Sequence, residues 1–448
     1  MAFRRARRRR AAGALAAAAA AVLASALPAQ AAPLRAAAPV EGRVQGAAAA
    51  VDGGYIVTLK RGAGVPAASS GQGRALVEKY GARVRRTYST ALNGYAVRAD
   101  EAQARRLAAD PGVASVTRDA EVSLRDTPSR RTALRDTALR DTALRDTALR
   151  DTPSRRTALR DTPSRRTQSR PPSWGLDRID QPDRPLDEAY TAPASAGRGA
   201  TIYVIDSGVR TSHRDFGGRA RSGWDFVDDD PVAEDGNGHG THVAAIAAGA
   251  RYGVAKRAGI VAVRVLDDRG EGTSAQVLAG LDWVLTHARR PAVVNLSLGT
   301  AVAAPVPEWD TAVRAGIAVG LTFTVAAGNQ NGPADSFSPG RVPQALTVGS
   351  TDRADRRSDF SNWGPAIDLF APGDRIVSAS NTSDTATRTL SGTSMAAPHV
   401  AGAAALHLAD HRSATADQVG AALTAEAVMG RVRGAGFGSP NRLLRVSN

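Results

Sequence analysis

The sequence feature that most constrains the fold is a regular alternation of short apolar runs with small-residue helical segments after residue 200. The first run, Thr-Ile-Tyr-Val-Ile-Asp at residues 201–206, is continuous and ends in a carboxylate. Runs of this kind are typical of parallel strands buried on both faces. We therefore predict an α/β fold with a parallel central sheet flanked by helices. The expected strands span residues 201–206, 260–266, 293–296, 322–327 and 346–349, and the expected helices span residues 239–250, 274–287, 309–319, 394–408 and 416–425.

A second feature is the segment Ser-Gly-Thr-Ser-Met-Ala-Ala-Pro-His at residues 391–399, which leads into an alanine-rich run. Gly392 permits a tight turn, so Ser394 would lie at the N-terminus of a helix. Unpaired N–H groups and the positive end of the helix dipole there stabilise an alkoxide or an oxyanion. The alternative is that Ser394 is only an N-cap.

Two upstream residues can activate such a serine. Asp206 ends the first strand, and His239 lies in the glycine-rich segment Asp-Gly-Asn-Gly-His-Gly-Thr-His that opens the next helix. A serine hydroxyl needs an imidazole to take its proton and a carboxylate to fix the imidazole tautomer. The chain order Asp, His, Ser is one of the orders in which this triad occurs.

Together these motifs resemble those of the subtilisin-like serine peptidases, most closely the proteinase K-like branch. Segments 252–256, 263–266, 294–299 and 325–329 add to the likeness, which covers about residues 173–448. The resemblance implies a serine-type endopeptidase with Ser394 as nucleophile, His239 as base and Asp206 as the orienting acid. It also implies that the side-chain amide of Asn329 donates to the oxyanion.

The resemblance further implies two extended segments that hold a substrate strand between them. Gly270 and Gly272 belong to one segment, and Ser297, Leu298 and Gly299 belong to the other. Pairing of this kind depends on the backbone of an extended peptide and discriminates little between side chains.

In relatives the primary specificity pocket is lined at positions that match Ala326, Ala327 and Gly328. Small residues leave a roomy apolar slot, so we expect broad cleavage after apolar or aromatic residues.

The resemblance also implies a structural Ca²⁺ site. The matching positions are Pro343 and Ala345, through their carbonyl groups, and the carboxylate of Asp368. Hard oxygen ligands of this kind suit Ca²⁺.

Three other polar residues lie in the same motifs but are expected to be structural. His242 competes with His239 for the role of base, and the family places the base at the first histidine. A zinc site of the His-Glu-x-x-His type would need a glutamate where Gly240 follows His239. His399 and Asn295 are expected to pack in the interior.

The N-terminal third is organised as a leader, a small domain and a linker. Residues 1–31 combine an arginine-rich start, an apolar stretch and Ala-Gln-Ala, which predicts a cleaved secretory signal rather than a membrane anchor. Residues 53–124 predict an α+β unit that resembles the inhibitory propeptide of the same family, with residues 121–124 as the tail in the substrate cleft. A small independent binding domain is the alternative. Residues 125–172 repeat Arg-Asp-Thr-Ala-Leu with a period that fits neither helix nor strand, which predicts a disordered linker.

Composition and charge argue against several other classes of function. The chain has no cysteine, which excludes a cysteine nucleophile and a thiolate zinc site. Its net charge is +15, but residues 173–448 carry 26 Lys and Arg against 29 Asp and Glu. The basic excess lies in segments expected to be removed or disordered, so nucleic-acid binding is not expected.

We therefore expect a secreted, extracellular and monomeric enzyme made as a self-inhibited zymogen, with no membrane segment after signal removal. Its expected partners are protein or peptide substrates and its own propeptide. The alternative is a catalytically silent binding protein of the same fold.

Overall fold

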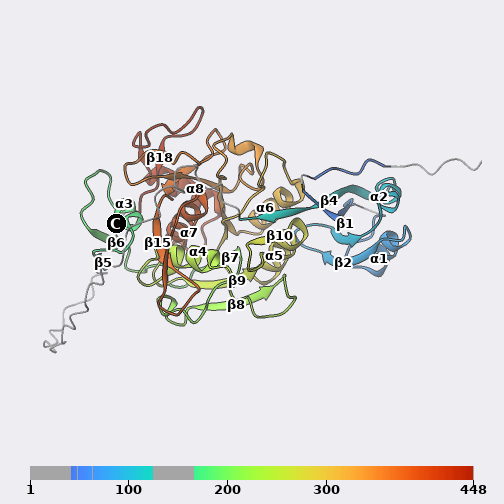
Figure 1. Cartoon of the computed structure of the whole chain (residues 1–448), viewed down its shortest axis with the longest axis horizontal. Coiled ribbons are helices and arrows are strands. Elements are labelled where there is room, and N and C mark those ends of the chain that lie inside the picture. The colour runs from blue at the N-terminus through green and yellow to red at the C-terminus, as the bar shows by residue number, and fades with distance from the viewer. Residues whose placement is uncertain (1–41, 48, 63, 125–165, 447–448) are drawn as a thin grey trace, which may run out of the picture. The chain divides into compact units, whose positions relative to one another are not determined.

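The computed structural model describes residues 42–47, 49–62, 64–124 and 166–446 of the 448-residue chain. The predicted signal, residues 1–31, and most of the predicted linker lie outside the described residues. The described residues form an N-terminal part, residues 42–124, and a larger C-terminal part, residues 166–446 (Figure 1).

The N-terminal part is an antiparallel sheet with two helices, in agreement with the predicted α+β unit. Its strands occur in the order β4-β1-β3-β2. Tyr55, Val57, Val77, Tyr95 and Leu107 belong to its buried core. Residues 121–123 of the predicted tail are the last three residues of strand β4. The elements are β1 (Ala50–Leu59), α1 (Gly71–Glu78), β2 (Arg83–Tyr88), β3 (Gly94–Arg98), α2 (Glu101–Ala108) and β4 (Val113–Ser123).

The C-terminal part is built on a nine-stranded sheet in the order β17-β18-β14-β13-β12-β11-β7-β9-β8. Every neighbouring pair is parallel except β17 with β18. This sheet confirms the predicted α/β class. Its strands are β7 (Thr201–Asp206), β8 (Ala220–Asp225), β9 (Gly259–Arg264), β11 (Ala292–Leu296), β12 (Thr322–Ala326), β13 (Leu346–Thr351), β14 (Leu369–Pro372), β17 (Val428–Met429) and β18 (Arg442–Leu443).

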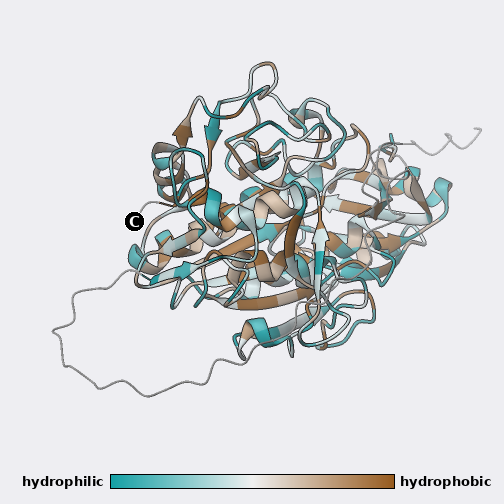
Figure 2. Cartoon of the chain, turned by 60° about the vertical axis from the view of Figure 1, so that its left-hand side comes forward, coloured by the Kyte–Doolittle hydropathy of each residue, from teal (hydrophilic) through white to brown (hydrophobic). Residues whose placement is uncertain are grey.

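Helices cover both faces of this sheet, which explains why its strands read as continuous apolar runs. In β7, Ile202 and Val204 pack into one core cluster, whereas Tyr203 and Ile205 pack into the other. Figure 2 shows the hydrophobic residues gathered along these central strands. The helices are α3 (Trp174–Ile179), α4 (His239–Ala248), α5 (Ser274–His287), α6 (Pro307–Ala318), α7 (Thr393–Asp410) and α8 (Ala416–Glu426). The first core cluster includes residues of α4 and α7, and the second includes residues of α5 and α6.

Several short elements lie outside the main sheet. Strand β5 (Arg166–Ser169) pairs with β6 (Ala189–Ala192), so the last residues of the predicted linker are ordered here. β15 (Ile376–Ala379) and β16 (Thr387–Leu390) form a hairpin. Short 3₁₀ helices occur at Arg214–Phe216 and Ala334–Ser336. β10 (Glu271–Thr273) joins the edge of the N-terminal sheet at β4.

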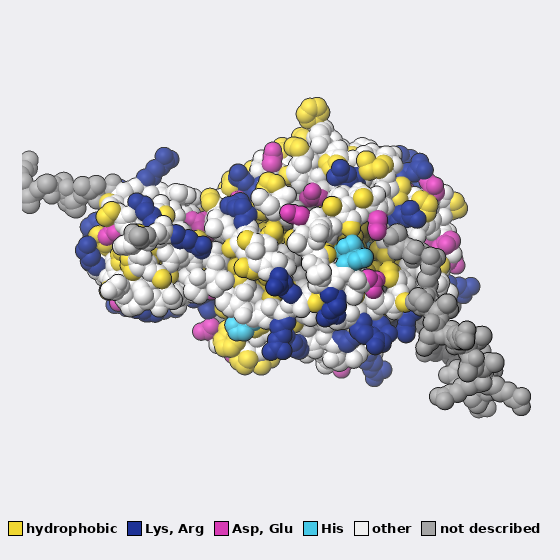
Figure 3. Space-filling model, turned by 180° about the vertical axis from the view of Figure 1, so that it is seen from behind, with side chains coloured by type: hydrophobic (Ala, Val, Ile, Leu, Met, Phe, Trp, Pro, Cys, Tyr) yellow, Lys and Arg dark blue, Asp and Glu magenta, His cyan; other side chains and the backbone are white. Residues whose placement is uncertain are grey.

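The surface of the described residues mixes all side-chain types. Figure 3 shows Lys and Arg side chains in several groups on one face, with acidic and apolar side chains among them. In the described part of the chain, no helix has both the length and the apolar character needed to cross a bilayer.

Candidate active site

Asp206 and His239 are brought together by the ends of two adjacent elements. Asp206 is the last residue of β7 and is fully buried, and His239 is the first residue of α4. Nδ1 of His239 donates a hydrogen bond of 2.8 Å to Oδ1 of Asp206. Because the carboxylate occupies Nδ1, the neutral imidazole keeps its proton there and presents Nε2 as its basic nitrogen.

A second buried carboxylate, Asp235, holds this pair in register, and the sequence analysis gave it no role. Its Oδ1 accepts the Ser207 hydroxyl at 2.9 Å, and its Oδ2 accepts the Thr241 amide at 2.8 Å. The Ser207 hydroxyl in turn accepts the Gly240 amide at 3.0 Å. Burial raises the pKa of Asp235. The only sequence signal for this role is that Asp235 opens the glycine-rich segment that contains His239.

Ser394 lies in the first turn of α7 but is not its N-cap. The cap is Gly392, which supplies no side chain, and the helix begins at Thr393. The Ser394 hydroxyl donates to the Ser297 carbonyl at 3.0 Å, and the Ser297 hydroxyl donates to the Ser394 carbonyl at 2.8 Å. α7 packs against α4, so the helix that carries Ser394 lies beside the helix that begins at His239.

Asn329 follows strand β12 and is tied to the same helix. Its Oδ1 accepts hydrogen bonds from the main-chain N and the hydroxyl of Thr393, at 2.8 Å and 2.9 Å. These bonds turn the amide so that Nδ2, its donor end, faces away from Thr393. Gly328 also donates its N–H to the Thr393 hydroxyl at 3.1 Å. Thr393 is therefore a positioning residue that the sequence analysis missed.

The three polar residues expected to be structural lie in the interior. Nε2 of His242 donates to the carbonyls of Ile376 and Arg388 at 3.1 Å each, and burial lowers the pKa of His242 to about 3. Nδ1 of His399 donates to the Met395 carbonyl at 2.8 Å, and burial lowers its pKa to about 4.

Asn295 lies inside β11 and is fully buried. Its Nδ2 donates to the Ser297 hydroxyl at 2.9 Å, and its Oδ1 accepts the Thr324 hydroxyl at 3.0 Å. This amide braces the strand end that contacts Ser394, which fits the expected packing role.

The first predicted substrate segment is paired with the N-terminal part of the chain. β10 runs antiparallel to β4, with Gly272 opposite Val122, and the Leu124 amide donates to the Gly270 carbonyl at 2.9 Å. Gly270 has φ +75°, and a Cβ there would lie 3.2 Å from Leu124. The last described residues of the N-terminal part therefore form a strand on this edge.

The remaining predicted substrate residues lie at neighbouring strand ends. Ser297, Leu298 and Gly299 follow β11, and Leu298 is buried. Ala326 ends β12, and Ala327 and Gly328 follow it, with both alanines buried.

Two buried carboxylates mark the junction between the parts. Oδ1 of Asp119 accepts the Ala275 amide in the first turn of α5 at 2.9 Å, and burial raises the pKa of Asp119 to about 6. Glu308, at the start of α6, accepts the Thr117 hydroxyl at 2.6 Å, and burial raises its pKa as well. Both contacts place charged groups of one part against the other.

Further contacts complete this junction. The Tyr88 hydroxyl donates to the Ala275 carbonyl at 2.8 Å. Asp282, on α5, accepts the main-chain amides of Thr90 and Ala91 at 2.8 Å and 2.7 Å. Leu92 of the N-terminal part belongs to the same core cluster as residues of α5 and α6.

Of the predicted calcium ligands, Asp368 is hydrogen-bonded to the residue Thr347, which follows Pro343 and Ala345 closely in the chain. Asp368 exchanges two hydrogen bonds with Thr347, from the Thr347 amide to Oδ2 at 2.8 Å and from its own amide to the Thr347 carbonyl at 2.9 Å. Thr347 is two residues beyond Ala345 and four beyond Pro343. Burial raises the pKa of Asp368 to about 6. A partly buried carboxylate beside carbonyl-bearing residues fits a hard cation such as Ca²⁺.

Comparison with known proteins identifies relatives of both parts. The sequence model of the subtilase family matches residues 197–442, and that of peptidase inhibitor I9 matches residues 54–125. An extracellular serine proteinase of Thermus sp. (strain Rt41A) is 44% identical over 364 residues, which cover 81% of this chain and 78% of that protein. Alkaline serine exoprotease A of Vibrio alginolyticus is 50% identical over 271 residues, which cover 60% of this chain and 49% of that protein. The crystal structure of a cold-adapted subtilisin-like serine proteinase shows 49% identity and a TM-score of 0.59, and the match covers 61% of this chain and 97% of that one.

Proposed function

We propose that this chain, which belongs to the subtilase family of serine proteinases, hydrolyses peptide bonds with Ser394 as nucleophile, His239 as base and Asp206 as the orienting carboxylate. The observation that carries the proposal is the 2.8 Å hydrogen bond from His239 to Asp206, on a helix packed against the helix of Ser394. The named relatives are proteinases, and nothing in the described residues favours a catalytically silent binding protein.

The proposed reaction starts when the Ser394 hydroxyl turns from the Ser297 carbonyl toward Nε2 of His239. Ser394 Oγ attacks the scissile carbonyl while His239 takes the proton. The resulting oxyanion accepts hydrogen bonds from Nδ2 of Asn329 and the Ser394 amide. His239 then protonates the leaving amine, and water releases the acyl group by the reverse sequence.

Substitution of the nucleophile tests this mechanism. In Ser394→Ala we expect kcat/KM on a peptide substrate to fall by about 10⁶-fold, a loss of the size seen when a triad serine is removed. The kcat/KM of His239→Ala should fall by a similar factor, because the two residues act as one unit. A Ser394→Ala enzyme that keeps more than a hundredth of its activity would refute the assignment.

We also propose that residues 42–124 inhibit the enzyme until they are removed. The support is the strand pairing of β4 with β10, which places a peptide strand where a substrate strand would lie. N-terminal sequencing of the secreted protein from the wild type and from Ser394→Ala tests this. We expect the mature N-terminus only in the wild type, and identical processing in the mutant would exclude self-cleavage. Recovery of the protein from culture medium tests secretion, which the extracellular Thermus relative supports.

We propose a broad preference for apolar or aromatic residues on the acyl side of the cut. Ala326, Ala327 and Gly328 have little or no side chain at the strand end beside Asn329, so they leave room for a large apolar side chain. A peptide library should show cleavage after several such residues, whereas strict cleavage after Arg or Asp would exclude the preference.

We propose that Pro343, Ala345 and Asp368 hold a structural Ca²⁺ ion. The ion would offset the cost of keeping the Asp368 carboxylate charged in its buried position. Chelation with EDTA should lower the thermal midpoint of the wild type by several degrees and that of Asp368→Asn by much less. Equal losses in the two proteins would place calcium elsewhere.

A further inference from the structure

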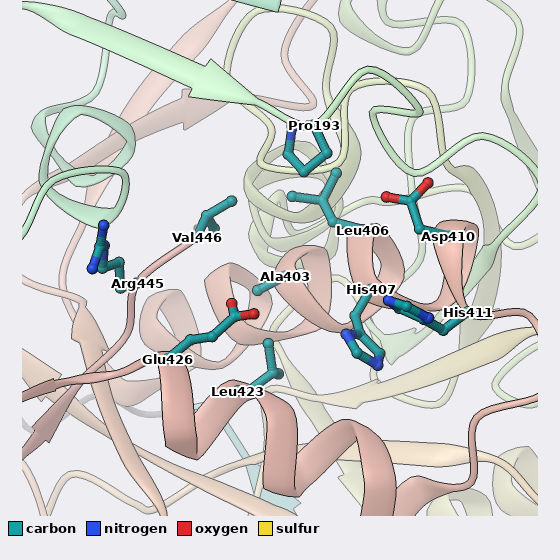
Figure 4. Close-up of a pocket in the computed structure, with 10 residues that line it drawn as sticks. All are labelled: Pro193, Ala403, Leu406, His407, Asp410, His411, Leu423, Glu426, Arg445 and Val446. Atoms are coloured by element: carbon teal, nitrogen blue, oxygen red, sulfur yellow. The ribbon is translucent and has the colours of Figure 1, made fainter. Parts of the chain in front are cut away.

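A pocket of about 250 Å³ lies at the end of α7 remote from Ser394. Figure 4 shows its lining, to which α7 contributes His407 and Asp410, the residue after α7 contributes His411, and α8 contributes Glu426. At 1.5 Å per residue, the 13 residues from Ser394 to His407 correspond to about 20 Å along the helix. This pocket is therefore separate from the proposed catalytic centre.

His407 and His411 are one helical turn apart and face the same pocket. The His411 amide donates to the His407 carbonyl at 2.8 Å, so the helical turn extends to His411. Their ring centroids are 4.4 Å apart with an interplanar angle of 33°. Within the described residues neither ring makes a hydrogen bond, so all four ring nitrogens lack protein partners there. Two histidines spaced by four on one helix face can bind one transition-metal ion.

Two carboxylates and one guanidinium, that of Arg445, line the pocket with this histidine pair, so acidic side chains outnumber basic ones there. Glu426 and Asp410 both place negative charge near His407. Oδ2 of Asp410 already accepts the Ser195 hydroxyl at 3.2 Å. Glu426 has no hydrogen bond or ion pair with the other described residues, and it is exposed enough to change rotamer.

We propose that His407, His411 and Glu426 bind a divalent transition-metal ion of the Zn²⁺ type. Among the residues that the structure describes, no three His, Asp or Glu side chains already converge in metal-binding geometry. The two imidazoles supply the initial site, and the Glu426 side chain turns toward them when the ion binds. Water completes the tetrahedral shell.

The consequence of binding is a cross-link between two helices. Glu426 is the last residue of α8, and the two histidines lie at the end of α7. An ion held by all three joins these helix ends, which stabilises the folded state over the unfolded chain by mass action. Because the site is about 20 Å from Ser394 along α7, the ion should raise stability without entering the reaction.

Calorimetric titration of ZnCl₂ into the untagged full chain tests the site. Ser394→Ala in the background prevents self-digestion, and an excess of CaCl₂ fills sites that take hard cations. We expect one Zn²⁺ per chain and a higher thermal midpoint in its presence. His407→Ala and His411→Ala should each weaken binding by at least about tenfold, and Glu426→Gln should weaken it several-fold, because each removes one ligand.

Matched controls separate this site from general surface binding. His287→Ala removes an exposed histidine that stacks on Trp283, and Asp417→Asn removes an exposed carboxylate at the other end of α8; both should leave the affinity unchanged. Circular dichroism checks that each variant is folded. An absence of Zn²⁺ binding in the parent, or equal binding in the His407→Ala/His411→Ala double variant, would overturn the proposal. Unchanged affinity in Glu426→Gln would overturn the three-ligand site.

Discussion

The N-terminal and C-terminal parts of this molecule bury their sheets in different ways. The antiparallel sheet of residues 42–124 has one core of its own, and residues such as Ile56 and Tyr88 are instead buried in a cluster with α5 and α6. The parallel sheet of the C-terminal part has a core on each face. The smaller part thus depends on the larger one to bury the apolar side chains that lie outside its own core.

The residues that hold the two parts together are distinct from the residues that we propose carry out the reaction. The junction consists of β4 against β10, together with Asp119 and Glu308 at the first turns of two helices. The proposed reacting groups lie at the end of β7, at the start of α4 and in the first turn of α7. Substitutions in one set should therefore leave the properties of the other set intact.

Among the substitutions that compare the two regions, Asp206→Asn should have the largest effect, because it impairs the reaction without altering the junction. In Asp206→Asn the His239 tautomer is no longer fixed, so kcat on a peptide substrate should fall by about 10⁴-fold. The thermal midpoint of the uncleaved chain should stay near that of Ser394→Ala. A loss of less than tenfold would mean that Asp206 does not orient the base.

The next effect concerns the pH dependence of folding stability that arises from Asp119 at the junction. The pKa of Asp119 is raised to about 6 from an ordinary value of 3.8, so the folded chain binds the proton more tightly than the unfolded chain does. The associated stability is fully present below about pH 4 and is lost as the pH rises through about 6. Asp119→Asn keeps the acceptor for Ala275 but cannot ionise, so in the Ser394→Ala background its free energy of unfolding relative to the parent should be higher at pH 8 than at pH 5, by between about 1 and 2 kcal/mol.

Chemical denaturation of the paired variants at pH 5 and pH 8 measures this difference. The control is Asp52→Asn, which alters an exposed carboxylate of the same part. If Asp119→Asn and Asp52→Asn responded equally to pH, burial of Asp119 at the junction would not control the titration.

The smallest expected effect concerns the edge at β10, where β4 pairs and where we propose that a substrate strand pairs. Gly270→Ala introduces strain at φ +75° and a Cβ 3.2 Å from Leu124. We expect about a tenfold rise in KM and a similar weakening of inhibition in the uncleaved chain, with kcat little changed. Gly217→Ala is the control. Gly217 has φ +52° and open space around it, so the substitution introduces similar backbone strain without a contact such as that with Leu124. A rise in KM without weaker inhibition would show that the two strands do not bind the same edge.

The sequence predicted the central elements better than the peripheral ones. The strand at 201–206 and the helix at 274–287 occur with the predicted bounds, because each has a continuous pattern and a clear boundary residue. β8 was not predicted, since Ala-Arg-Ser-Gly-Trp-Asp lacks an apolar run. β14 was missed because it has four residues and ends in proline. Both segments become strands through their pairing partners, β9 for β8 at the sheet edge, and β13 and β18 for β14.

The candidate active site, too, was predictable from the sequence only in part. The chemistry of the motifs was enough to predict that Asp206 and His239 are neighbours, and they are hydrogen-bonded. The orienting contacts from Asp235 and Thr393 depend on which backbone amides face which side chains. That information exists only after β7, α4 and α7 have packed, and one sequence does not contain it in readable form.

Labelling with a phosphonylating reagent that reacts with activated serines, followed by peptide mass spectrometry, tests whether His239 activates Ser394. We expect a single adduct on Ser394 in the processed enzyme and a labelling rate at least about 10³-fold lower in His239→Ala. An adduct on another residue, or an unchanged rate in His239→Ala, would contradict it.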